Sequence, residues 1–96
     1  MRRDVVLRII AENREEIARF GVKSLAIYGS VARDEAGTES DVDLLVEFSK
    51  PVGLFGFVEL KEYLERILGR PVDLGTPGSL REEIREEVLR ESVRAA

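Results

Sequence analysis

Residues 29–48 read GSVARDEAGTESDVDLLVEF, so a Gly29-Ser30 pair stands twelve residues before Asp41, the first residue of an Asp-x-Asp pair. The apolar run at 25–28 predicts a buried strand that stops at Gly29, and Ser30 can be the N-cap of a short helical stretch over 31–36. The first N–H groups of a helix lack partners and lie at the positive end of its dipole. This turn therefore predicts an anion site that suits a triphosphate.

The Asp-x-Asp pair opens a second predicted strand, over 41–46. Side chains alternate along a strand, so Asp41 and Asp43 should lie on one face, about 6–7 Å apart along the chain. Mg²⁺ is usually held by one or two carboxylates with substrate phosphates, and paired metals about 4 Å apart steady the entering and leaving oxygens. We therefore expect Asp41 and Asp43 to bind two Mg²⁺ ions, while Gly29 and Ser30 bind the phosphates of a nucleotide.

Each motif has a simpler explanation when it stands alone. A Gly-Ser pair is most often a strand-to-helix turn, and an Asp-x-Asp pair is usually a solvated strand edge. Their order here, each joined to an apolar strand, favours a metal-dependent nucleotide-transfer site. A later short strand, 71–75, carries Asp73 between two apolar residues, and a carboxylate that points inward there needs partners. Asp73 either caps a turn near Gly75 or lies beside the metals with the other two aspartates.

The stretch from Gly29 to Leu44 resembles the nucleotidyltransferases of the DNA polymerase beta-like superfamily, and within it the minimal nucleotidyltransferase family of small prokaryotic proteins. The shared pattern runs from the Gly-Ser pair through Ala32 to the Ser-Asp-x-Asp-Leu segment at 40–44. The chain departs from it at Asp34, where a glycine is common, and this residue puts a negative charge a few residues from the expected phosphate site. The resemblance covers nearly the whole chain.

The resemblance implies a third carboxylate from a later strand, and Asp73 is the matching residue, as a metal ligand or a base. It also implies transfer of a nucleoside monophosphate, AMP from ATP, to a hydroxyl. Many members of this family are antitoxins encoded with a HEPN-domain ribonuclease toxin, and some adenylylate a tyrosine of that toxin. A HEPN-type toxin is therefore the expected partner, in a hetero-oligomer.

The remaining pattern predicts one α/β (α+β) domain over residues 1–96, with helices packed on a small mixed three-stranded sheet. The helices are expected at 4–20, 54–69 and 79–93, the last starting from a capping-box pattern at Ser79. A connector of about ten residues between the first two strands requires them to run antiparallel. The long helix after the second strand then returns the chain to a third strand beside it.

Composition excludes several classes of function. The chain has 15 Lys and Arg against 19 Asp and Glu, a net charge of −4, and the basic residues are interleaved with acidic ones. Nucleic-acid binding by this chain alone is therefore not expected. With neither cysteine nor histidine, disulfides, thiolate chemistry and histidine-dependent catalysis are excluded. No apolar run has the length of a signal peptide or membrane span, which predicts a cytoplasmic protein.

Two alternatives to an adenylylating antitoxin remain open. The chain could be a non-catalytic antitoxin or binding subunit that masks its partner, or a catalytic subunit that modifies a small molecule once a substrate-binding partner docks. Ninety-six residues leave no room for a separate substrate domain, so each of these functions requires a partner.

Overall fold

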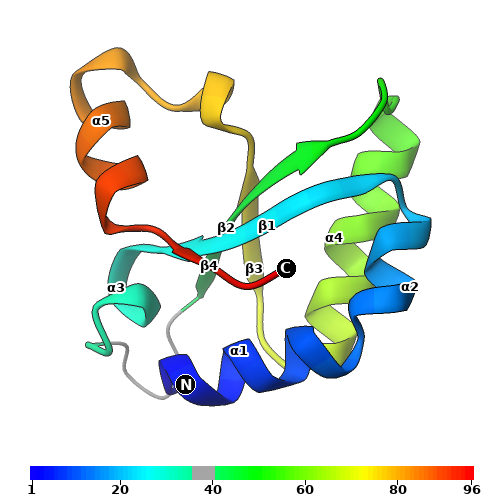
Figure 1. The fold of residues 1–96 in the computed structure, drawn as a ribbon, viewed down its shortest axis with the longest axis horizontal. Helices are drawn as coiled ribbons and strands as arrows, with labels where there is room; N and C mark the ends of the chain where they lie inside the picture. Colours follow the sequence, from blue (N-terminus) through cyan, green and yellow to red (C-terminus); the bar gives the residue numbers. More distant parts are fainter. Residues whose placement is uncertain (36–40) are drawn as a thin grey trace.

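The computed structural model describes residues 1–35 and 41–96, and in them the chain forms a four-stranded mixed sheet in the order β3-β2-β1-β4 (Figure 1). The strands are β1 (Val22–Tyr28), β2 (Val42–Phe48), β3 (Val72–Gly75) and β4 (Val93–Arg94). β1 and β2 run antiparallel and β3 lies parallel to β2, which confirms the predicted arrangement of three strands. The prediction of only three strands is wrong by one, because β4 pairs with β1 at the other edge.

Three helices lie on the same side of the sheet in Figure 1: α1 (Arg3–Glu12), α2 (Arg14–Arg19) and α4 (Leu54–Leu68). The single helix predicted over 4–20 is divided at Asn13, whose backbone leaves the helical region at φ −110°. The Asn13 side-chain amide donates to the Ile9 carbonyl at 2.8 Å. The amide thereby competes for a backbone acceptor at the break, as asparagine side chains do.

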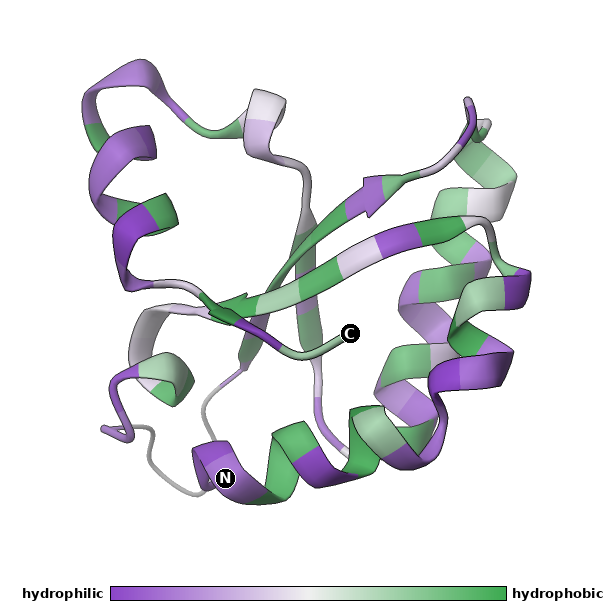
Figure 2. Cartoon of the chain, viewed as in Figure 1, coloured by the Kyte–Doolittle hydropathy of each residue, from purple (hydrophilic) through white to green (hydrophobic). Residues whose placement is uncertain are grey.

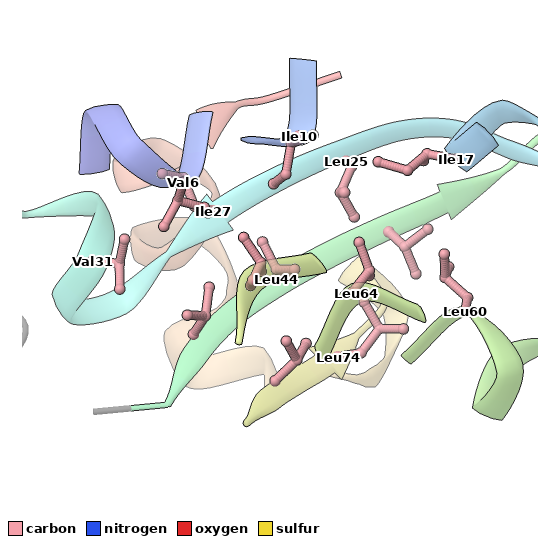
Figure 3. Close-up of a cluster of buried hydrophobic side chains, with 14 of the residues drawn as sticks. Val6, Ile10, Ile17, Leu25, Ile27, Val31, Leu44, Leu60, Leu64 and Leu74 are labelled. Carbon is pink, nitrogen blue, oxygen red and sulfur yellow. The ribbon is translucent and has the colours of Figure 1, made fainter. Parts of the chain in front are cut away.

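The hydrophobic core lies between these helices and one face of the sheet (Figure 3). Alternate residues of each strand point into it, as a half-covered sheet requires. The fully buried large side chains are Val6, Ile10, Ile17, Leu25, Ile27, Val31, Val42, Leu44, Val46, Leu60 and Leu64. Figure 2 shows hydrophobic and hydrophilic residues alternating along α1 and α4, as expected of helices with one face in the core.

The last helix, α5 (Glu82–Glu91), lies apart from the other long helices and contributes no fully buried residue (Figure 1). It begins three residues later than predicted, because Ser79 closes a separate short 3-10 turn, η1 (Pro77–Ser79). The Ser79 hydroxyl donates to the Thr76 carbonyl at 2.8 Å and accepts from the Thr76 amide at 3.1 Å. The helix ends before the predicted Val93, since Ser92 is extended and leads the chain into β4.

Candidate active site

The corner after β1 is built around Gly29, which has φ +70°, a left-handed conformation that favours glycine. A Cβ atom added at Gly29 would collide with the Oδ2 atom of Asp43 and lie 3.3 Å from its Cγ. Two constraints therefore require glycine here, the backbone angle and the close approach of the Asp43 carboxylate. The corner and the second aspartate of the Asp-x-Asp pair, far apart in sequence, form one site.

Ser30 lies within the short helix α3 (Gly29–Ala32) rather than at its N-cap, which is Tyr28. No side chain caps this helix, so the predicted capping role of Ser30 is wrong. Within the described residues, the Ser30 hydroxyl has no hydrogen-bond partner and is therefore available to a ligand. The predicted continuation of the helix beyond Ala32 is wrong, because α3 ends there and the backbone turns at Arg33. Residue 36, the predicted end of the helical stretch, and Ser40 of the sequence motif lie outside the described residues.

Asp43 and Asp73 lie side by side on neighbouring strands. Asp43 of β2 is in register with Asp73 of β3, and on its other side with Tyr28 of β1. Because Leu44 and Leu74 are buried in the core, the alternation of the strands directs these three side chains to the opposite face. An inward-pointing Asp73 is therefore ruled out, since its side chain is exposed, while Asp43 is half-buried.

Asp41 lies one residue before β2 and is exposed. Burial raises the pKa of the Asp43 carboxyl above its ordinary value, and the charges of Asp73 and Asp41 raise it further, whereas Arg33 opposes the shift. Asp73 and Asp41 are thus each within electrostatic reach of Asp43. In the described part of the chain, however, no three acidic, histidine or cysteine side chains are gathered as a ready-made metal cluster.

This arrangement fits a divalent cation. Asp73 and Asp41 each act on the half-buried Asp43 carboxyl beside the glycine corner, and a cation would relieve the repulsion that, after burial, raises the Asp43 pKa. Hard oxygen ligands in such a group are those that Mg²⁺ prefers. A polar hollow of about 440 Å³ lies elsewhere, along residues 11–16 and Arg19, and contains none of these residues.

Sequence reasoning missed Arg33, which follows α3 directly and is the cation that acts on Asp43. Its Nε atom lies 3.3 Å from Glu35 Oε2, and its Nη1 atom lies 3.2 Å from Glu91 Oε2 of α5. Arg33 therefore joins the corner after β1 to the last helix. The available signal was a lone arginine, three residues beyond Ser30, in a stretch rich in acidic residues.

Tyr28 was also missed, although alternation along β1 places it on the face of Asp43. The side chain is half-buried. Burial, followed by the charges of Asp43 and Asp73, raises the pKa of Tyr28 above its ordinary value of 10.0. Its hydroxyl therefore stays protonated at neutral pH, beside the two carboxylates.

Asp34 has φ 60°, which explains why a glycine suits this position. Its Oδ1 atom accepts a hydrogen bond of 3.1 Å from the backbone N–H of Arg3, at the start of α1. The Arg3 guanidinium in turn donates to the Ala32 carbonyl at 3.0 Å. The charge expected to disturb the phosphate site is thus turned toward the N-terminus of α1, and Asp34 is not among the groups that shift the pKa of Asp43.

The fold and the glycine-aspartate site together define a nucleotidyltransferase. Residues 7–95 match the family model described as "Nucleotidyltransferase domain". The chain is 46% identical over 85 residues to "Protein adenylyltransferase MntA" of Thermococcus cleftensis, which covers 88% of this chain and 86% of the relative. The chain therefore belongs to the nucleotidyltransferase family, among the MntA-like minimal nucleotidyltransferases.

Solved structures agree with this assignment. One assigned to the minimal nucleotidyltransferases is 40% identical, with a TM-score of 0.74, and the match covers 91% of this chain and 93% of that one. The fold is also shared with a chain from a complex described as a tri-AMPylated Shewanella oneidensis HEPN toxin with MNT antitoxin. This match has a TM-score of 0.59 and 17% identity, and it covers 90% of this chain and 71% of that one. Within residues 1–35 and 41–96, no helix has the length and apolar character needed to span a membrane.

Proposed function

We propose that the chain transfers AMP from ATP to a tyrosine hydroxyl of a HEPN-type ribonuclease toxin and thereby acts as its antitoxin, in a hetero-oligomer with that toxin. The name of the T. cleftensis relative and the AMPylated toxin in the S. oneidensis complex support the acceptor class. The observation that carries the proposal is the contact of the Gly29 corner with Asp43, which joins a phosphate-binding turn to the carboxylates.

The donor side of the reaction belongs to Gly29, Ser30 and Arg33. The backbone of the corner and the free Ser30 hydroxyl would donate hydrogen bonds to the phosphates, and Arg33 would add a positive charge. These groups also stabilise the charge that develops on the leaving pyrophosphate. Hydrogen bonds and charges fixed in position before the reaction are worth more than the same groups in water, because they need not reorganise.

The acceptor side belongs to Asp73. The tyrosine oxygen would attack the α-phosphorus, the bond from that phosphorus to pyrophosphate would break, and the tyrosine proton would pass to the Asp73 carboxylate. Asp41, Asp43 and Asp73 would hold two Mg²⁺ ions. When bound, such ions neutralise charge on the entering and leaving oxygens and lower the proton affinity of the attacking hydroxyl.

The proposed setting is the cytoplasm, where ATP, Mg²⁺ and a ribonuclease toxin are found together. The dispersed positive charge of the chain supports protein rather than nucleic-acid recognition, since nucleic-acid binders depend on a concentrated basic surface. The partner therefore has to bring its acceptor tyrosine to the sheet face that carries Asp43 and Asp73.

The test uses the chain, MgATP and the protein encoded by the neighbouring gene, followed by intact-mass measurement of both proteins. Transfer predicts an added AMP on the partner, mapped to a tyrosine. Replacing Asp41, Asp43 and Asp73 with asparagine should abolish this addition and the protection of cells, while the complex still forms. Full protection by the triple variant, with no nucleotide on the partner, would instead identify an antitoxin that acts by masking. Glu47→Gln is the matched control, since it removes one negative charge from the exposed end of β2.

A further inference from the structure

Tyr28 occupies a defined place in the row of side chains on the face of the sheet opposite the core. The order across the strands is Tyr28, Asp43, Asp73, one residue from each of β1, β2 and β3. Tyr28 directly precedes Gly29, so it lies on the same side of Asp43 as the phosphate-binding corner. Asp73, the proposed proton acceptor, lies on the other side.

The Tyr28 hydroxyl is a hydrogen-bond donor that has no acceptor among the described residues. Among residues 1–35 and 41–96 it has no hydrogen-bond partner, although the side chain is half-buried. The hydroxyl oxygen is not among the buried polar atoms that lack a partner in the described residues, so it is accessible from outside the protein. The register of Tyr28 with Asp43 places this side chain at the strand position next to the carboxylates, where its O–H group can donate a hydrogen bond to a bound ligand.

We propose that the Tyr28 hydroxyl donates a hydrogen bond to the triphosphate of the bound donor, on the leaving-group side of Asp43. This inference rests on the proposed nucleotide transfer and adds a substrate-contacting residue to it. In-line displacement needs the acceptor opposite the leaving group. The position of Tyr28 beside the phosphate corner therefore makes it a donor contact and not an internal acceptor of AMP.

Calorimetry tests this contact with two ligands, Mg·ATP and Mg·tripolyphosphate. The second ligand has a phosphate chain but no base. Tyr28→Phe keeps the ring and removes only the hydroxyl. Both ligands should bind about ten-fold more weakly, the scale of one hydrogen bond to a charged group. Tyr63→Phe is the matched control, since Tyr63 lies on α4, away from the carboxylates. The centre of its ring lies 5.2 Å from that of Phe20, and its hydroxyl donates a hydrogen bond to Asn13 Oδ1 at 3.2 Å. This control should leave both affinities unchanged.

A spectroscopic measurement adds a readout that does not depend on transfer. The chain has two tyrosines and no tryptophan, so in Tyr63→Phe all emission comes from Tyr28. Mg·tripolyphosphate does not absorb at the wavelengths at which tyrosine is excited and emits. It should change the Tyr28 emission at the concentrations at which calorimetry detects binding.

Each other outcome overturns the inference. If both ligands bind but Tyr28→Phe binds them as tightly as the unmodified chain, the inference fails and the proposed function stands. Weaker binding of ATP alone would make Tyr28 a contact of the base or sugar, which also refutes a triphosphate contact. If the unmodified chain binds neither ligand, the inference and the proposed function fail together.

Discussion

Asp43→Asn should make the protein more stable while it abolishes nucleotide transfer. The Asp43 carboxylate is half-buried beside Asp73 and Asp41, and both its burial and these charges raise its pKa. The folded protein therefore binds this proton more tightly than the unfolded chain does, so stability falls as the pH rises through the Asp43 pKa. Asparagine keeps the shape and removes the repulsion. We expect a gain of about 1 kcal/mol at neutral pH, typical of relieving a strained active site.

Thermal unfolding measures this gain, which corresponds to about 4–8 °C in the midpoint for a domain of this size. Mg²⁺ should reverse the order of the two proteins, because ligand at a hundred times its Kd stabilises the native state by about 2.7 kcal/mol. The unmodified protein should gain this stabilisation and Asp43→Asn should not. Glu47→Gln, on the same strand and face, should change neither quantity. An Asp43→Asn variant that is less stable without Mg²⁺, or that still transfers AMP, would refute the reasoning.

Three further predictions concern the rest of the site and the surface. Ser30→Ala should weaken binding of Mg·ATP about ten-fold in calorimetry, which is the scale of a lost hydrogen bond to a charged group. Ser49→Ala, in the loop after β2, is the control and should not change the affinity. Unchanged affinity in Ser30→Ala would leave Ser30 without a ligand role. Asp34→Gly should change the free energy of unfolding by less than about 1 kcal/mol, because two effects oppose each other. Glycine relaxes the left-handed backbone, while the hydrogen bond from the Arg3 amide is lost. A larger loss of stability in chemical denaturation would mean that this hydrogen bond dominates. The chain alone should show no salt-sensitive binding to DNA or RNA in fluorescence anisotropy, and submicromolar binding that collapses with salt would reveal a basic groove.

The sequence was sufficient to predict those elements of the fold that carry a strong periodic signal. β1, β2, β3 and α4 each combine an apolar pattern with a turn residue near the end, and all four were predicted, although β1 begins three residues earlier and β2 ends two residues later than expected. β4 has only two residues and follows a helix without a turn signal, so its pairing with Ala26 and Ile27 depends on tertiary contact alone. The break at Asn13 was hidden, because the apolar stripe continues on both sides of it.

In the site, the spacing of the two motifs along the sequence predicted that Gly29 lies close to the Asp-x-Asp pair. The close approach of Gly29 and Asp43 agrees with this prediction. The position of Asp73 came from family resemblance, and its register with Asp43 follows from the parallel pairing of β2 and β3. Tyr28 was overlooked because an aromatic residue at the end of an apolar strand indicates core. Only the register of β1 on β2 shows that it faces Asp43 instead.

Asp34 illustrates how a departure from a family pattern should be interpreted through backbone geometry. A left-handed conformation costs an ordinary residue roughly 1–2 kcal/mol, and aspartate is among the few side chains that tolerate it. Its hydrogen bond to the Arg3 amide offsets that cost by about 1 kcal/mol, and a negative charge at a helix N-terminus adds about 0.3–1 kcal/mol. The substitution therefore preserves the turn that glycine would make and fastens α1 to it. Since this charge is directed at α1, Asp34 is not among the groups that act on Asp43, and the charges that do are the negative Asp73 and Asp41 and the positive Arg33.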